Sequence, residues 1–195
     1  MKAFSLFAKN HDDDVFLYLH MGTPDVGWEL LSIAHRLEID KRLVLSGIEN
    51  GPKQVSTKVL NLIYNATDVG LNTAEGEGWS LTNMEHGVTG APQIVPDHSA
   101  LTEIYKDIGI LVPIDYWLID RQTNTNRGYV TPEDVAETLE FLYRNKKEIE
   151  TIGENTRKKF ISKEYNWKYI VQNFWLPVIK NAMKTKSTVI NIDNK

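Results

Sequence analysis

The residue types best suited to chemistry gather in one short run, Glu-Gly-Glu-Gly-Trp-Ser, from Glu75 to Ser80. Gly76 and Gly78 permit backbone conformations that other residues resist and let a ligand approach the main chain closely. A helix is predicted to begin at Ser80, and the first N–H groups of a helix have no partner inside it. With the helix dipole, these groups form a site for an anion such as a diphosphate. The N–H groups concerned belong to Trp79, Ser80, Leu81 and Thr82.

Two carboxylates, Glu77 and Glu85, flank this predicted anion site. Glu85 lies about five residues into the helix, so about 7 Å along its axis at about 1.5 Å per residue, roughly the reach from a bound phosphate to its ribose. A carboxylate can accept two hydrogen bonds from a ribose diol. Glu77 precedes the helix, where the hydroxyls of a sugar beyond the phosphates would lie. The pair indicates a ligand with hydroxyls on both sides of its phosphates, although a Gly-rich turn with two solvated glutamates explains these residues equally well.

The elements predicted around this run alternate between short apolar strands and helices. We predict strands over 15–20, 42–46, 68–72, 93–95 and 109–112, and helices over 28–37, 55–66, 80–86 and 99–105. The runs at 15–20 and 42–46 are continuously apolar, which is typical of strands buried on both faces. Such alternation predicts an α/β fold with a doubly wound parallel sheet, which binds ligands at the carboxyl ends of its strands.

The rest of the chain is predicted to be helical after one irregular segment. Residues 113–130 fit no periodic pattern and are long for a connection, so we expect a surface insertion or a functional loop. Thr131-Pro132-Glu133-Asp134 is a helix start signal, and helices are predicted from there to about 144, over 146–161 and over 167–183. Pro177 should kink or restart the last one. We expect one domain over 1–183 and a polar tail over 184–195.

Composition excludes several functional classes. The net charge of −4 argues against a nucleic-acid partner, because phosphate neutralisation needs clustered Lys and Arg. The chain has no cysteine, and its 5 histidines show no metal-ligand spacing, so we expect no metal and no other cofactor. No run approaches the ~20 apolar residues of a transmembrane segment, and no signal peptide is recognisable, so we expect a cytoplasmic protein.

A longer string extends the run around Glu77. Glu77-Gly78-Trp79-Ser80-Leu81 is followed by Glu85, by Gly90-Ala91-Pro92-Gln93-Ile94-Val95 and by Ser99-Ala100-Leu101-Thr102-Glu103. This order resembles the donor-binding motif of the retaining GT-B glycosyltransferases of the group 1, glycogen-synthase-like superfamily. The family pattern is Glu, Gly, an aromatic, a small residue, Leu, three variable residues and Glu, then a Gly-x-Pro strand and a small-residue loop ending in Glu. The resemblance covers about residues 6–175.

The resemblance implies a fold, a reaction and a set of roles. The fold would be the Rossmann-like, C-terminal half of a GT-B fold with added C-terminal helices. The reaction would move a hexose from a UDP- or GDP-sugar to an acceptor with retention and without a metal. Glu77 would be the catalytic residue at the transferred sugar, residues 78–81 would bind the diphosphate, and Glu85 would hold the ribose diol. The base would lie near Ser46, Gly47 and Ile48.

Two departures from the family concern charge and completeness. The family carries an Arg and a Lys for the diphosphate on the first strand and first helix of this domain, and Lys2 and Lys9 do not stand at those positions. We therefore expect the first strand and the acceptor-binding N-terminal domain to be missing here, and the isolated chain to be inactive. Ser99 to Thr102, with His98 before them, replace the usual pair of small residues.

Two alternatives to an enzyme domain stay open. One is a nucleotide or sugar-nucleotide binding module without catalysis, and the other is a domain for protein association.

Overall fold

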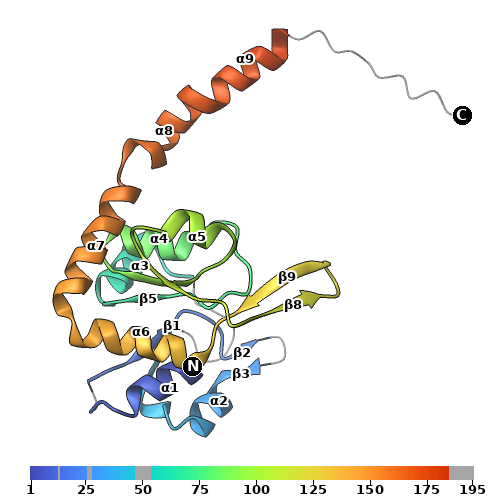
Figure 1. Ribbon diagram of the computed structural model, residues 1–195. Coiled ribbons are helices and arrows are strands. Elements are labelled where there is room, and N and C mark those ends of the chain that lie inside the picture. The colour runs from blue at the N-terminus through green and yellow to red at the C-terminus, as the bar shows by residue number, and fades with distance from the viewer. Residues whose placement is uncertain (13, 26–27, 47–53, 185–195) are drawn as a thin grey trace, which may run out of the picture.

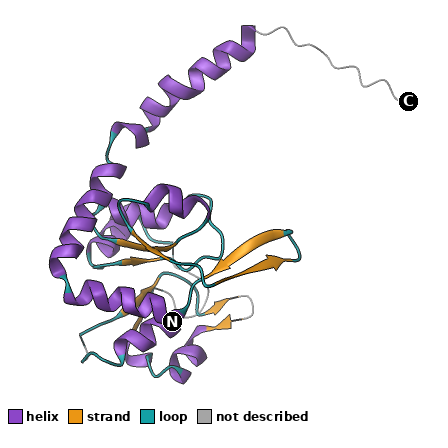
Figure 2. Ribbon diagram, viewed as in Figure 1, coloured by secondary structure: helices purple, strands orange, loops and turns teal. Residues whose placement is uncertain are grey.

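The computed structural model describes residues 1–12, 14–25, 28–46 and 54–184 and has an α/β fold built around parallel strands (Figure 1, Figure 2). One parallel pair consists of β1 (Leu17–Leu19) and β4 (Leu43–Leu45). A second parallel sheet has the order β5 (Gly70–Leu71), β6 (Gln93–Pro96), β7 (Ile110–Val112). Four of these strands fall within predicted ones, and β6 extends one residue beyond its predicted end. The predicted α/β class is confirmed.

Helices connect and cover these strands. They are α1 (Lys2–Ala8), α2 (Leu30–Arg36), α3 (Thr57–Asn65), α4 (Leu81–Val88), α5 (Ser99–Tyr105), α6 (Pro132–Arg144), α7 (Lys146–Phe160), α8 (Trp167–Ile170) and α9 (Leu176–Lys184). Figure 1 shows α3, α4 and α5 at one end of the body and α1, α2 and α6 at the other. The labelled strands β1 and β5 lie between these two groups.

Two hydrophobic core clusters lie on the two faces of β6. Ile94 and Val95 are fully buried, and successive residues of a strand point to opposite faces. Ile94 packs in a cluster with residues of α1, β7 and α6, and Val95 packs in a cluster with residues of α5 and α7. The members are Ala3, Val112, Val135 and Leu142 on one face, and Leu101, Ile104, Tyr105 and Phe160 on the other. Helices on both faces make this sheet doubly wound, as predicted.

The first two strands are less buried than their sequences predict. Leu17 lies opposite Leu43, and both pack against the cluster formed by α1 and α2. The prediction that these strands are buried on both faces is wrong, because Val44 is 45% exposed and Phe16, directly before β1, is 58% exposed. A continuous apolar run shows that one face is covered, but it does not show that the other is.

The predicted helix over 28–37 begins two residues late. Trp28 belongs to β3 (Trp28–Glu29), which pairs antiparallel with β2 (Pro24–Asp25). The Glu29 carboxylate accepts the N–H groups of Leu31 and Ser32 and so caps α2. A carboxylate is well placed at this position, because it satisfies N–H groups that the helix leaves free.

The irregular segment 113–130 forms a hairpin that projects from the body (Figure 1). Its strands are β8 (Tyr116–Asp120) and β9 (Thr125–Tyr129), paired antiparallel. A surface insertion is what the sequence predicts here, but the two strands have no periodic pattern that would have predicted them. Tyr116 to Ile119 are all apolar and all exposed, so no alternation of polarity could mark the strand.

The C-terminal helices form a rod that leaves the body after α7 (Figure 1). A π-helical turn, η3 (Val171–Trp175), joins α8 to α9, and Pro177 is the second residue of α9, so the helix restarts there as predicted. The rod exposes Trp167, Phe174, Trp175, Val178 and Met183, which are 57% to 82% exposed. None of the helices in the described part of the chain combines the length and hydropathy that a membrane span requires. Of the predicted polar tail, Lys184 ends α9, and 185–195 lie outside the described residues.

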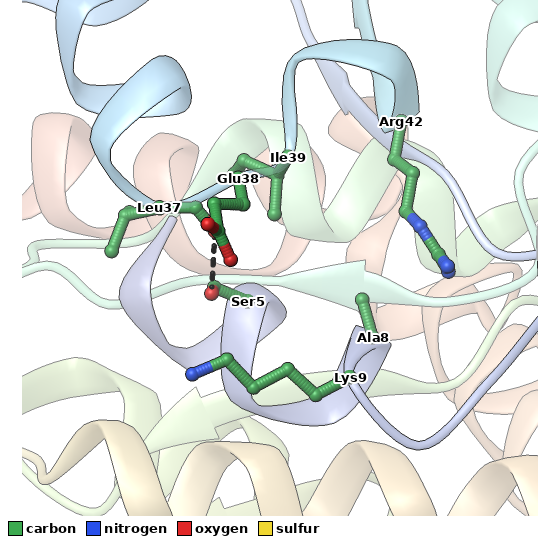
Figure 3. Close-up of a pocket in the computed structure, with 7 residues that line it drawn as sticks. All are labelled: Ser5, Ala8, Lys9, Leu37, Glu38, Ile39 and Arg42. Carbon is green, nitrogen blue, oxygen red and sulfur yellow. Dashed lines mark hydrogen bonds between the residues drawn. The ribbon is translucent and has the colours of Figure 1, made fainter.

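A small pocket of about 110 Å³ lies between α1 and the turn that follows α2 (Figure 3). It is lined by Ser5, Ala8, Lys9, Leu37, Glu38, Ile39 and Arg42. The Ser5 hydroxyl donates to the carbonyl of Leu37 at 2.9 Å across it. Arg42, in η1 (Asp40–Arg42), donates to the carbonyls of His11 and Asp12. The pocket contains none of the predicted site residues.

Candidate functional site

The Gly-rich loop connects the carboxyl end of β5 to α4, where a doubly wound sheet binds its ligands. The next connection, from β6 to α5, meets it. The N–H of Glu77 donates to the hydroxyl of Ser99 at 3.2 Å, and the N–H of Ala100 donates to the carbonyl of Glu77 at 3.4 Å. The structure therefore brings Glu77 against the small-residue loop that precedes Glu103.

The mouth of α4 differs by one residue from the prediction. Ser80 is the N-cap residue, with a left-handed φ of 59°, and the helix begins at Leu81. The Ser80 hydroxyl donates to the Asn83 side chain at 2.5 Å and caps no N–H group. The N–H groups at the helix mouth are therefore those of Ser80, Leu81, Thr82 and Asn83, and that of Trp79 belongs to the loop.

A buried polar network beneath the loop fixes this unusual backbone. Asn72 donates to Ser80 Oγ at 2.9 Å and to Asn83 Oδ1 at 3.0 Å, and it accepts the N–H of Ala74 at 2.7 Å. Asn83 donates in turn to Gln93 Oε1 at 2.8 Å, and Gln93 is fully buried. A satisfied buried network of this kind specifies one arrangement of the loop, because each group would be costly to leave unpaired. No motif or spacing in the sequence singles out these three amides.

His98 ties the same loop from the other side. It is 4% exposed, its Nε2 lies 2.8 Å from the carbonyl of Ala74, and its Nδ1 lies 2.8 Å from the hydroxyl of Ser99. Since a carbonyl only accepts, Nε2 carries the proton, and Nδ1 accepts from Ser99. His98 thus connects Ala74, in the Gly-rich loop before Glu77, to Ser99, whose hydroxyl accepts the Glu77 N–H.

Glu85 is held by a residue that the sequence did not single out. The Tyr64 hydroxyl, from α3, donates to Glu85 Oε2 at 3.0 Å, and Glu85 itself is exposed. Burial, then the hydrogen bond to Glu85 and its charge, raise the pKa of Tyr64 to about 12. The Tyr64 ring stacks on His86, whose pKa is lowered by burial and whose Nε2 contacts Thr67. The contact to Tyr64 fixes the orientation of the Glu85 carboxylate.

The remaining predicted residues lie in less organised surroundings. Trp79 donates its indole N–H to Met84 Sδ at 3.1 Å and packs on Tyr165, while Leu81 is 64% exposed. Ser46 follows β4, and its hydroxyl is buried without a partner among the described residues. Gly47 and Ile48 lie outside the described residues. The described ranges contain no group of three His, Asp or Glu side chains that could hold a metal ion.

Solved structures share this fold, although no protein-family model and no curated protein matches the sequence. A glycosyltransferase from Rickettsia africae matches with a TM-score of 0.69 and 14% identity, over 95% of this chain and 44% of that one. HepE from Anabaena, solved in complex with UDP, matches at 0.64 and 14%, over 92% and 44%. The C-terminal domain of a group 1 glycosyltransferase, LpcC, from Francisella tularensis matches at 0.61 and 17%, over 82% and 74%.

The extent of these matches shows which part of such proteins corresponds to this chain. The chain spans less than half of the Rickettsia and Anabaena proteins, but about three quarters of the Francisella C-terminal domain. The loop, α4 and the following βα connection lie at the carboxyl edge of the sheet in the order that the sequence resemblance implies. The chain has the fold of the C-terminal, Rossmann-like half of a group 1, GT-B glycosyltransferase.

Proposed function

We propose that this chain is the donor-binding domain of a retaining hexosyltransferase that uses a UDP- or GDP-sugar. The observation that carries the proposal is the Gly-rich loop at the carboxyl end of β5, followed by a helix whose first N–H groups carry no side-chain cap. Glu85 lies further along that helix, with its carboxylate oriented by Tyr64. The shared fold, and the UDP complex of the Anabaena protein, support the same function.

The proposed chemistry is electrostatic. The acceptor hydroxyl oxygen bonds to the sugar C1, and its proton passes to the leaving diphosphate. As the bond between C1 and the diphosphate oxygen breaks, negative charge builds up on that diphosphate. The N–H groups at the mouth of α4 stabilise this charge, since they are already oriented by the network of Asn72 and Asn83. Glu77 is the catalytic residue that accepts hydrogen bonds from the sugar hydroxyls and holds the sugar over the acceptor. We propose that no metal is needed for donor binding.

We further propose that an N-terminal acceptor-binding domain and a first strand complete the enzyme. The chain spans less than half of the Rickettsia and Anabaena proteins, which supports a further domain in the whole enzyme. The exposed apolar side chains of the rod from α8 to α9 also suit a covered surface. The isolated chain should therefore transfer no sugar at a useful rate. We propose a cytoplasmic location for the enzyme.

Thermal unfolding with nucleotides tests the donor site. At a UDP or GDP concentration about 100 times its Kd, binding should stabilise the chain by about 2.7 kcal/mol. That stabilisation corresponds to a rise in Tm of about 5–10 °C for a chain of this size. AMP at equal concentration is the control for non-specific anion binding. If neither UDP nor GDP raises the Tm beyond the AMP value, the chain has no donor site of this kind.

The Tyr64→Phe variant should bind its nucleotide about fivefold more weakly. The change removes about 1 kcal/mol of hydrogen bonding to Glu85 and lets the carboxylate rotate away from the ribose, while the ring still stacks on His86. Isothermal titration calorimetry measures the difference. Tyr143→Phe is the matched control, because Tyr143 donates to Asp14 in the same way but on α6. Equal losses in both variants would show that Tyr64 does not act through Glu85.

A further inference from the structure

The base of the β8–β9 hairpin is attached to the Gly-rich loop. The N–H of Gly128 donates to the carbonyl of Glu75 at 3.0 Å, and a hydrogen bond with the Glu75 carboxylate raises the pKa of Tyr129. On the opposite strand, the Trp117 ring packs edge-on against His98, which itself holds the loop. The hairpin, which stands between β7 and α6 in the sequence, therefore forms a wall beside the candidate site.

Arg127 lies on the face of the hairpin that meets the loop. Its Nη1 is so close to Gly76 that a Cβ added to that glycine would lie 3.0 Å away. Arg127 is paired with Leu118 across the hairpin, so it shares a face with Asp120, whose carboxylate lies 3.1 Å from Arg127 Nη2. The guanidinium therefore lies against the main chain of the loop, and its side chain is 31% exposed.

Asp120 fixes the position of this guanidinium. Its carboxylate also accepts the N–H of Gln122 at 2.8 Å and the hydroxyl of Thr123 at 2.9 Å, in the turn of the hairpin. These hydrogen bonds, with that of Arg127, lower the pKa of Asp120 to about 2. Asp120 is therefore ionised at neutral pH and holds one edge of the guanidinium. A guanidinium has five N–H donors, so this contact leaves donors for a ligand.

The acidic residues around the loop show why a bound diphosphate would need a positively charged partner. Glu75 and Glu77 stand on either side of Gly76, and Glu85 follows on α4, so the side chains closest to the anion site in sequence are acidic. A diphosphate bound among carboxylates requires a positive charge nearby. Arginine suits this role, because its planar fork matches two phosphate oxygens and stays protonated.

We propose that Arg127 binds the diphosphate of the donor at the Gly-rich loop, and that Asp120 positions it. The inference rests on the donor site proposed above and adds to it a cation supplied by the hairpin. The position of Arg127 against Gly76 carries it, with the ion pair to Asp120 and the surrounding carboxylates. Arg127 then contributes to phosphate binding and makes no contribution to recognition of the nucleoside.

Calorimetric titration of the full chain with UDP and GDP, and with uridine and guanosine, tests this assignment. Arg127→Gln should lower affinity for the preferred nucleotide about tenfold and leave affinity for its nucleoside unchanged, because the lost contact is to the phosphates. Arg127→Lys should recover part of the loss. Asp120→Asn should weaken nucleotide binding less than Arg127→Gln. The Tm of each variant without ligand shows whether the hairpin and the fold persist.

Arg121→Gln is the matched control, since Arg121 is an exposed arginine at the turn of the same hairpin and its loss changes the net charge equally. If Arg127→Gln and Arg121→Gln weaken UDP or GDP binding equally, the effect is one of overall charge and the assignment is wrong. If Arg127→Gln binds as the unchanged chain does while Glu85→Ala binds poorly, the donor site stands and Arg127 has no part in it. If the unchanged chain binds neither nucleotide, both the proposed donor site and the proposed role of Arg127 are wrong.

Discussion

The Glu85→Ala variant is expected to bind its preferred nucleotide, UDP or GDP, about 30-fold more weakly than the unchanged chain. Glu85 is exposed on α4, past the N–H groups of the helix mouth, and Tyr64 holds one of its oxygens at 3.0 Å. A carboxylate so placed can accept the hydrogens of a ribose diol, and each hydrogen bond to a charged group is worth about 1.5–3 kcal/mol. The two hydrogen bonds from the diol should together contribute about 2 kcal/mol, because the site is open to water, which competes for the carboxylate. Calorimetric titration measures the loss.

A nucleotide without the ribose 2′-hydroxyl separates this role from a general loss of structure. The unchanged chain should bind the 2′-deoxy form of the nucleotide several-fold more weakly than the parent form. The Glu85→Ala variant should bind the two forms with equal affinity. Such a cycle isolates the pairwise contact. Glu137→Ala, which removes an exposed glutamate from α6, is the control for net charge. The same deoxy penalty with and without Glu85 would show that this carboxylate does not hold the ribose.

The parts of the fold that follow local rules could be predicted from the sequence. Thr131 begins α6 as expected, and its hydroxyl accepts the N–H of Asp134 at 3.0 Å. The predicted end of the next helix differs from that of α7 by one residue. These signals lie within a few residues of the structure they determine. The hairpin after β7 had no comparable signal, because its apolar strand residues do not alternate and its turn has no Asn-Gly pair.

The same distinction between local and tertiary signals applies to the residues of the candidate site. Glu77 and Glu85 stand within one loop and one helix, so spacing along the chain suffices to single them out, and their roles stay predictions. Gln93 and Arg127, which support and flank that loop, come from other elements and meet it only in the folded chain. A glutamine in an apolar strand and an arginine in an irregular segment have no local feature that indicates such contacts. Tertiary packing alone brings them to the site.

The Gly153→Ala variant should be less stable than the unchanged chain by about 3 kcal/mol, with a Tm lower by about 6–12 °C. Two effects oppose each other here. Alanine favours a helix over glycine by about 1 kcal/mol. However, a Cβ at Gly153, in the middle of α7, would lie 1.8 Å from the carbonyl oxygen of Gly90. Gly90 lies in the turn that follows α4, where its N–H donates to the carbonyl of Gly87 at 3.0 Å, so moving its carbonyl aside would disturb that turn. The clash therefore outweighs the gain in helix propensity.

The same substitution should also disturb the candidate site, because α7 packs directly on α4. A Cβ at Gly87, in α4, would lie 2.6 Å from the side chain of Thr156 in α7, which shows how closely the two helices approach. A displaced α7 shifts α4 and with it the N–H groups at its mouth, so Gly153→Ala should also bind nucleotide more weakly. Asn155→Ala, at an exposed position of α7, provides the control: it gains helix propensity without a clash and should raise the Tm slightly. A Tm for Gly153→Ala at or above that of Asn155→Ala would contradict the close contact between α7 and Gly90, and thermal unfolding followed by circular dichroism decides between the two.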